Sequence, residues 1–265
     1  MKLAEKDILG YRFCRMTLVE TVELLAKWSE EEQERARYFC CVNPHSIEVS
    51  RKDPEFAEAI HASDLVTADG TGIIIASRIL NAQIPERVCG PDIFPDLCTR
   101  LNTAKAGTRM FFLGSDDENL AVLERKFRQE FPHLECVGTY APPFAKVFSD
   151  DQNAEIISRV NASGADILWV GLGAPKQEKW AFEHCRKLNV KVVGPVGGVF
   201  DFFSGRVKLP PQWVQKIGGI SIYRLLQEPR RLWRRNLNGP IFLMRVLGQL
   251  FREGRYKPSA DKSCD

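Results

Sequence analysis

Apolar residues along this chain follow two alternating patterns. Short, continuous apolar runs predict buried strands at residues 38–42, 65–68, 109–114, 135–140, 165–173 and 190–198. Apolar residues that recur every three or four positions predict helices at residues 17–28, 53–62, 73–80, 115–131, 150–163 and 175–188. Such alternation implies right-handed crossovers and a mainly parallel sheet with helices on both faces. The sequence therefore predicts an α/β fold with a doubly wound, Rossmann-like sheet.

Three of the predicted helices begin with capping residues. Thr17 and Glu20 have the spacing of a capping box, and so do Ser115 and Glu118. Asp53-Pro54 places an N-cap residue before a proline, whose missing N–H is harmless in a first helical turn. These signals predict where the three helices start.

The composition changes toward the carboxyl terminus. Pro210-Pro211 and Gly218-Gly219 interrupt the pattern, and residues 224–257 then hold nine basic and two acidic residues. The net charge of this stretch is +7, which leaves −4 on the rest of a chain whose net charge is +3. We expect a core over residues 1–218 and an Arg-rich helical appendage over 219–265 that meets the phosphates of a nucleotide, a lipid or a nucleic acid.

Cysteines and histidines form no metal-binding pattern in the sequence. The eight cysteines include no Cys-x-x-Cys pair and the four histidines lack ligand spacing, so no metal site is predicted. Without a secretory signal, the cysteines indicate thiols in a reducing cytoplasm. The longest apolar run, residues 240–251, is shorter than the roughly 20 residues that span a bilayer.

Four loops that follow predicted strands carry the candidate chemistry, at residues 42–46, 68–72, 171–178 and 194–205. Ligands of open parallel sheets bind beyond the carboxyl ends of strands, and glycines let backbone amides approach a phosphate. The loops match neither the dinucleotide fingerprint nor the P-loop, and the chain has no nucleophile elbow.

Asp69, in the second of these loops, has two interpretations. A partly desolvated carboxylate there would accept a proton from a substrate hydroxyl, whereas an ordinary Asp-Gly turn would use Asp69 to cap the next helix. Asn43 would likewise support its own backbone, and Arg87 would form a surface ion pair.

Two further loops carry polar candidates. Gln177 and Glu178 have two interpretations, as solvated residues of a first helical turn or as ligands. Asp201 lies between aromatic residues, where a carboxylate needs a partner or a ligand.

Five segments in order resemble the WecG/TagA/CpsF family of bacterial glycosyltransferases. They are NPHS…SDLVTADGTG, RVCGPDIF, VGLGAPKQEKW, GGVFDFFSGRVKLPPQW and YRLLQEPRRLWRRNL, within residues 8–240. The resemblance implies a cytoplasmic, membrane-associated, inverting glycosyltransferase without a tightly bound metal. It also implies transfer of N-acetylmannosamine or its uronic acid from a UDP-sugar to N-acetylglucosamine on undecaprenyl diphosphate, in cell-surface polysaccharide or teichoic acid synthesis.

The resemblance assigns roles to individual residues. Asp69 falls on the family's proposed general base, and Asn43, Arg87 and Gln177 fall on other motif positions. The implied nucleotide and diphosphate contacts are Gly114, Gly171, Gly173, Gly197, Gly198, Asp201, Arg224, Arg231 and Arg234. Because arginine binds diphosphate oxygens bidentately, we expect the carboxyl-terminal arginines to take the place of a divalent metal.

Two positions depart from the family pattern. Cys41 stands where the family usually has threonine, and a thiol is a weaker hydrogen-bond donor than a hydroxyl. GGISIYR, at residues 218–224, stands where relatives often have G-L-E-W before Y-R. We expect a divergent branch with a different donor sugar or acceptor and the same transfer chemistry.

Apolar residues accompany the carboxyl-terminal arginines. Leu232, Trp233, Leu237 and residues 240–251 give a pattern typical of a helix in a membrane interface. We expect the appendage to dock on the anionic inner leaflet, with no nucleic-acid partner and with self-association left open. Two alternatives stay open: a nucleotide-dependent oxidoreductase on a Rossmann-like sheet, and a non-enzymatic basic membrane adaptor.

Overall fold

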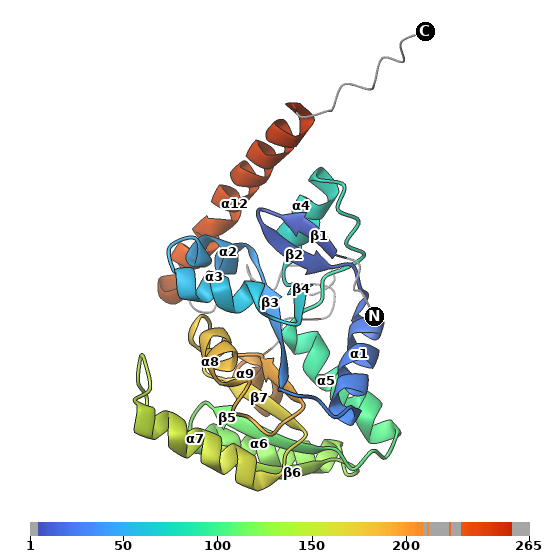
Figure 1. The fold of residues 1–265 in the computed structure, drawn as a ribbon, viewed down its shortest axis with the longest axis vertical. Coiled ribbons are helices and arrows are strands. Elements are labelled where there is room, and N and C mark those ends of the chain that lie inside the picture. Colours follow the sequence, from blue (N-terminus) through green and yellow to red (C-terminus); the bar gives the residue numbers. More distant parts are fainter. Residues whose placement is uncertain (1–4, 209–210, 212–222, 224–228, 256–265) are drawn as a thin grey trace.

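A six-stranded parallel sheet forms the centre of the molecule (Figure 1). The computed structural model describes residues 5–208, 211, 223 and 229–255, and in the last segment it describes the side chains of residues 238–252. The strand order is β4-β3-β8-β7-β5-β6, and every neighbouring pair is parallel. The predicted α/β fold class is therefore confirmed.

The strands of this sheet match the apolar runs of the sequence. They are β3 (Arg37–Val42), β4 (Leu65–Ala68), β5 (Arg109–Gly114), β6 (Glu135–Tyr140), β7 (Ile167–Gly171) and β8 (Val192–Pro195). A separate antiparallel hairpin of β1 (Glu5–Ile8) and β2 (Tyr11–Cys14) precedes them, which the sequence did not predict.

Helices connect the strands and cover the sheet. They are α1 (Leu18–Glu30), α2 (Pro44–Ser50), α3 (Pro54–His61), α4 (Thr71–Ile79), α5 (Gly90–Thr103), α6 (Asp117–Glu130), α7 (Asp150–Ser163), α8 (Lys176–His184), α9 (Val199–Ser204) and α12 (Pro229–Arg255). The sequence left α2, α5 and α9 unpredicted.

The sheet separates two hydrophobic cores because successive strand residues point to opposite faces. In β5, Phe112 packs with α1, α5, α6 and α9, whereas Phe111 faces α3, α7 and α8. In β7, Trp169 and Leu168 divide in the same way. Both faces of the sheet are therefore dry, which explains why its strands read as continuous apolar runs.

Helix starts agree with the capping signals at two of three places. Thr17 forms the predicted capping box with Glu20, and Asp53 caps α3 by accepting from Phe56 N–H. The prediction for Ser115 is wrong, since Asp116 caps α6 and accepts from Asn119 N–H. Ser115 has a positive φ of 62°, whereas an N-cap residue needs an extended backbone.

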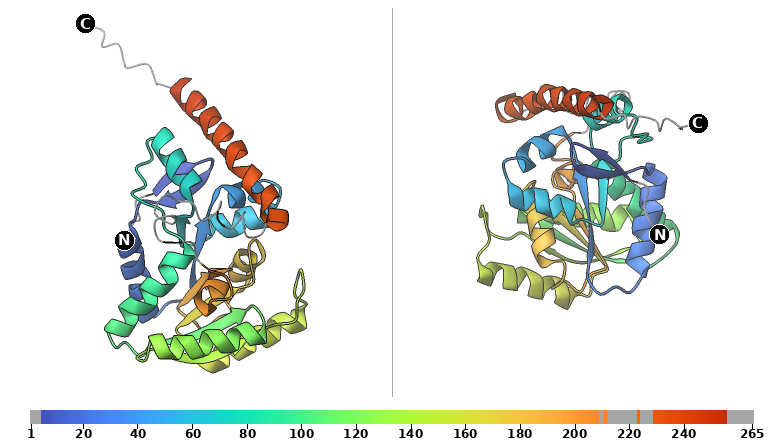
Figure 2. Two further views of the ribbon diagram at one scale, coloured as in Figure 1. Left: turned by 180° about the vertical axis from the view of Figure 1, so that it is seen from behind. Right: turned by 45° about the horizontal axis from the view of Figure 1, so that its top comes forward.

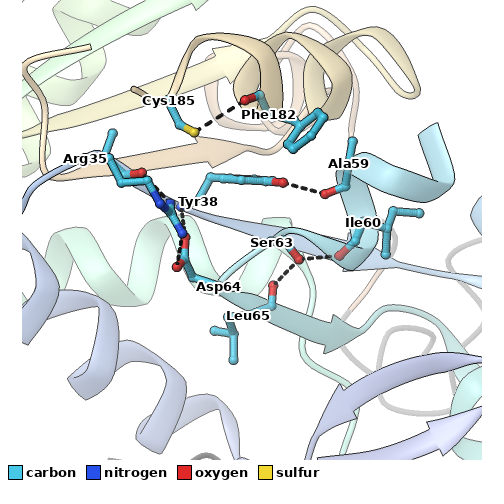
Figure 3. A network of polar contacts seen from close by, with 10 residues as sticks. Arg35, Tyr38, Ala59, Ile60, Ser63, Asp64, Leu65, Phe182 and Cys185 are labelled. Carbon is cyan, nitrogen blue, oxygen red and sulfur yellow. Dashed lines mark hydrogen bonds and ion pairs between the residues drawn. The ribbon is translucent and has the colours of Figure 1, made fainter. Parts of the chain in front are cut away.

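A polar network fixes the amino-terminal ends of β3 and β4 (Figure 3). Arg35 binds Asp64 bidentately at 2.9 and 2.7 Å, and Asp64 also accepts the Tyr38 backbone N–H at 3.0 Å. The Tyr38 hydroxyl donates to the Ala59 carbonyl at 2.6 Å. This network sets the register of the two strands from the edge opposite to their carboxyl ends.

Helix α12 packs on the body beside α2 and α4 (Figures 1 and 2). Phe242 and Val246 are fully buried in the core on that side of the sheet. Arg245 pairs with Glu48 of α2 at 3.0 Å, and Gln249 accepts the Leu9 N–H at 2.8 Å. The predicted boundary near residue 218 falls outside the described residues.

Candidate active site

Asn43 and Asp69 meet at the carboxyl ends of β3 and β4. The parallel register pairs Val42 with Ala68, the last residues of the two strands, so the residues that follow are neighbours. Asn43 Nδ2 donates to Asp69 Oδ2 at 3.0 Å, and the Asp69 N–H donates to the Val42 carbonyl at 2.9 Å. The sheet therefore brings together an amide and a carboxylate that are far apart in the sequence.

Asp69 does not act as a helix cap. The N-cap of α4 is Gly70, which has a φ of 88° and makes no side-chain cap. A Cβ at Gly72 would lie 2.5 Å from Pro44 Cγ, so the starts of α2 and α4 are in close contact. The turn interpretation of Asp69 is therefore wrong, and its carboxylate points toward Asn43 instead.

Asn43 supports its own backbone, as expected, and also contacts Asp69. It caps α2, where Oδ1 accepts from the Ser46 N–H at 3.0 Å, and its Nδ2 holds Asp69. The capping contact fixes the amide orientation, because Oδ1 must face the helix. The N–H group is thereby directed at the carboxylate.

Arg87 lies close to the same carboxylate. The Val88 N–H donates to the Ala68 carbonyl at 2.9 Å, which fastens the Arg87 loop to the end of β4. Its guanidinium pairs with Asp92 at 2.8 Å and donates to Cys89 Sγ. Burial alone would lower the pKa of Arg87, but Cys89, Asp92 and Asp69 raise it. The ion pair is mostly buried, so Arg87 brings a fixed positive charge to the site.

Two thiols complete this end of the sheet. Burial raises the pKa of Cys41, and the nearby Asp69 carboxylate adds to the rise. Burial and Asp69 act in the same way on Cys89, the N-cap residue of α5. Both side chains are neutral thiols here, so Cys41 is a weaker hydrogen-bond donor than a hydroxyl would be.

Gly114 and Gly171 are required by packing. A Cβ at Gly114 would lie 2.6 Å from the Gly171 carbonyl carbon, and one at Gly171 would lie 2.6 Å from a ring carbon of Phe200. The ends of β5 and β7 therefore approach more closely than any side chain allows. Packing alone therefore explains why both positions are glycine.

Gln177 is buried between two glycine loops. Its Oε1 accepts the Gly173 N–H at 3.1 Å, and a Cβ at Gly197 would lie 3.2 Å from the same oxygen. Gly198, the next residue, is the N-cap of α9 and makes no side-chain cap. The first-turn surface interpretation of Gln177 and Glu178 is wrong, because each is 5% exposed.

Asp201 already has protein partners. Its Oδ1 accepts from Asn119 Nδ2 at 3.1 Å and lies 4.0 Å from Arg206. Asn119 is buried and also donates to Ser115 Oγ at 2.9 Å. Asp201 thus ties α9 to α6 below the loop that follows β5.

A cavity of about 430 Å³ lies at the carboxyl ends of β5, β6 and β7. Its lining includes Ser115, Asp116, Phe144, Gly171 and Lys176. The Lys176 ammonium donates to the Ala145 carbonyl at 2.6 Å and sits over the Phe148 ring. The cavity opens on the same edge of the sheet as Asn43 and Asp69.

The carboxyl-terminal arginines are only partly visible. Arg224 lies outside the described residues, and Arg231 and Arg234 lie in α12 with side chains outside them. Within the described part of the chain, no three His, Cys, Asp or Glu side chains are grouped as a metal site would require. Over the same residues, no helix is both long and apolar enough to cross a membrane.

Sequence reasoning missed two residues of this region, Cys89 and Asn119, and did not predict the burial of Glu178. Glu178 is buried and bound to Gln177, and Cys89 joins Arg87 to Asp92. The Cys-Gly-Pro-Asp run at 89–92 signals a helix start with proline in its first turn, which would have placed Cys89. No local signal reveals the burial of Glu178 or Asn119.

Comparisons with known proteins give a consistent result. The family described as "Glycosyl transferase WecG/TagA/CpsF family" matches residues 6–256. An N-acetylglucosaminyldiphosphoundecaprenol N-acetyl-beta-D-mannosaminyltransferase from Bacillus subtilis (strain 168) is 30% identical over 224 residues, which cover 83% of each chain. A protein of the same name from Staphylococcus aureus (strain MW2) is 25% identical over 243 residues, 92% of each chain.

Proposed function

Since this chain belongs to the WecG/TagA/CpsF family and is a glycosyltransferase, we propose that it moves an N-acetylmannosamine-type sugar from a UDP-sugar to a sugar carried on a polyprenyl diphosphate. The names of the two relatives describe transfer of an N-acetylmannosaminyl group to N-acetylglucosaminyl diphosphoundecaprenol, which supports this acceptor class. The product would serve cell-surface polysaccharide or teichoic acid synthesis.

The contact between Asn43 and Asp69 carries the proposal. In a direct displacement, the acceptor hydroxyl forms a bond to the anomeric carbon while the bond from that carbon to the UDP oxygen breaks. Asp69 takes the hydroxyl proton, and Asn43 holds the carboxylate in the direction of the acceptor. Attack opposite to the leaving group inverts the anomeric configuration.

Positive charge must meet the departing diphosphate. Arg87 is held near Asp69 by Asp92, and we assign Arg224, Arg231 and Arg234 to the same task. Arginine suits this role because its fork binds two phosphate oxygens at once. Metal-independent transfer therefore remains part of the proposal.

The nucleoside of the donor fits the cavity at β5, β6 and β7. A volume of about 430 Å³ accommodates a base and a ribose, and the carboxylates of Asp116 and Asp117 can accept ribose hydroxyls. The pyrophosphate would then lie toward the loops after β7 and β8, between the cavity and Asp69.

The outward face of α12 is proposed to rest on the anionic inner leaflet, where the lipid acceptor resides. Met244, Leu247 and Phe251 share this face at i, i+3 and i+7, with 65%, 44% and 67% of each residue exposed. Apolar side chains beside arginines are typical of interfacial helices. The protein would then be peripheral on the cytoplasmic side.

The two alternatives from the sequence are set aside. The family match spans nearly the whole chain and names a glycosyl transferase, which neither an oxidoreductase nor an adaptor without activity explains. An adaptor would also have no use for the half-buried contact between Asn43 and Asp69.

A UDP-release assay over a panel of nucleotide sugars, with N-acetylglucosaminyl diphospholipid as acceptor, tests the proposed function. We expect acceptor-dependent UDP release to be fastest with UDP-N-acetylmannosamine or its uronic acid. If none of the UDP-sugars gave UDP release, or if UDP release did not require the acceptor, the proposal would be excluded.

A further inference from the structure

Gln177 and Glu178 form a buried pair at the start of α8. Gln177 Nε2 donates to Glu178 Oε1 at 2.9 Å, and Gln177 Oε1 accepts the Gly173 N–H at 3.1 Å. An amide has one oxygen acceptor and one nitrogen donor group, so these two contacts together determine its orientation. Glu178 therefore holds the nitrogen side of the Gln177 amide, while the Gly173 N–H holds its oxygen.

The oriented amide spans two loops at the ligand edge of the sheet. Gly173 follows β7 and has a φ of 81°, and Gly197 follows β8, with its Cβ position 3.2 Å from Gln177 Oε1. The Gly197 N–H is in turn bound to the Val170 carbonyl of β7 at 3.2 Å. A turn of the Gln177 amide would break the Gly173 contact.

We propose that Glu178 is a positioning residue for sugar transfer, whose ionised carboxylate holds the Gln177 amide and thereby the loops after β7 and β8 in the arrangement that transfer requires. Protonation of Glu178 weakens this hold. The inference rests on the proposed function, because those loops are assigned to the donor pyrophosphate.

No cation among the described residues compensates the charge of Glu178. Burial, the largest influence, raises its pKa to about 7, although hydrogen bonds from Gln177 and from its own backbone N–H act in the opposite direction. Among the described residues, its Oε2 has no hydrogen-bond partner. A carboxylate that accepts from Gln177 makes a stronger hydrogen bond than the neutral acid, so the hold changes near neutral pH.

The charged and titratable groups on the described elements that pack around Glu178 do not neutralise its carboxylate. Cys40 and Cys41 of β3 lie near Glu178, and burial raises the pKa of both thiols, so they are neutral. Lys179, its neighbour on α8, is paired with Asp53 and Glu55 at the start of α3. Strands β7 and β8 contribute no titratable side chain.

Side-chain and backbone amide spectra test the coupling without any substrate. In the ¹⁵N-labelled full chain, the Gln177 Nε2 and Gly173 N resonances should shift together between pH 5.5 and 8.5, with a midpoint near 7. The shift should be absent in Glu178→Gln and present in Glu183→Gln, a control on the exposed side of the same helix. Resonances that ignore pH, or that still titrate in Glu178→Gln, would overturn the inference.

Steady-state transfer measures the consequence. We expect the wild-type kcat to fall below a midpoint near pH 7, and Glu178→Gln to lower kcat about tenfold at pH 8 with a donor KM within about twofold of wild type. The fall of kcat near pH 7 should disappear in this variant. Adding Glu178→Gln to Gln177→Ala should lower kcat little further. A wild-type kcat and pH profile in Glu178→Gln would overturn the inference while leaving the proposed function intact. Absence of transfer by the wild type would instead refute the proposed function, and the spectra would still decide the coupling.

Discussion

The contact between Asn43 and Asp69 joins residues that lie 26 positions apart. Each follows a four- to six-residue strand, and the Arg35–Asp64 pair aligns these strands from their other ends. The geometry of the carboxylate is therefore set by backbone register together with a capped helix start. Such a site is rigid because neither residue depends on a long surface loop.

Replacing Asp69 with asparagine tests the base directly. The amide keeps the size of the side chain but cannot take a proton, so we expect kcat to fall at least about 100-fold. The donor KM should stay within about twofold. Steady-state UDP release gives both numbers, with Asp92→Asn as a comparison that changes the partner of Arg87 and Cys89 and leaves the Asp69 carboxylate in place. Near-normal turnover of Asp69→Asn would exclude the role.

Glu178 should also make the free energy of unfolding depend on pH. Its pKa is raised from 4.5 to about 7, so its contribution to stability is present below pH 4.5 and is lost as pH rises through about 7. This rise in the pKa corresponds to about 3 kcal/mol in the free energy of unfolding. We expect the free energy of unfolding of the wild type, relative to Glu178→Gln, to fall by about that amount between pH 5 and pH 8 in urea titrations. Parallel pH curves for the two proteins would contradict it.

Sequence predicted the site residues that follow strands, but not how deeply they lie. Asp69 and Asn43 could be expected at one edge because parallel strands end together. The burial of Gln177 and Glu178 depends on contacts with the loop after β8, and the partner of Asp201 comes from α6. Such contacts join distant segments, and no local pattern specifies them.

At the level of elements, the strands were predicted best. The ranges 109–114 and 135–140 coincide with β5 and β6. Helix α5 was missed because Pro91 and Pro95 obscure its apolar period. The β1–β2 hairpin was missed because charged residues interrupt both strands, EKDI and YRFC, so neither gives a continuous apolar run.

Helix α12 presents two faces that can be separated by mutation. Replacing Met244, Leu247 and Phe251 with serine should abolish binding to anionic vesicles and change the melting temperature little, because all three side chains are exposed. Phe242→Ala should instead cost about 3 kcal/mol of stability, because Phe242 is fully buried. Vesicle sedimentation and urea unfolding distinguish these results. Undiminished vesicle binding by the serine variant would refute the proposed docking face.

On the scale of the whole molecule, removing residues 219–265 should abolish membrane binding and most turnover. The deletion also takes Phe242 and Val246 out of the core, so we expect the melting temperature to fall. Vesicle sedimentation, UDP release and thermal unfolding measure the three effects. The serine variant of α12 is the control, since it keeps those core residues. A fully active truncated chain would show that the appendage is dispensable.

The position of α12 also bears on how the protein is made. Gln249 binds the backbone of Leu9 across 240 residues, and Phe242 and Val246 fill a core that includes Ile8 of the first hairpin. During translation, β1 and β2 leave the ribosome long before α12. The apolar surface of α2, α4 and the hairpin that α12 covers is therefore exposed during most of translation. This core is therefore complete only when α12 has emerged, and a nascent chain that stalls earlier would expose its apolar surface to chaperones.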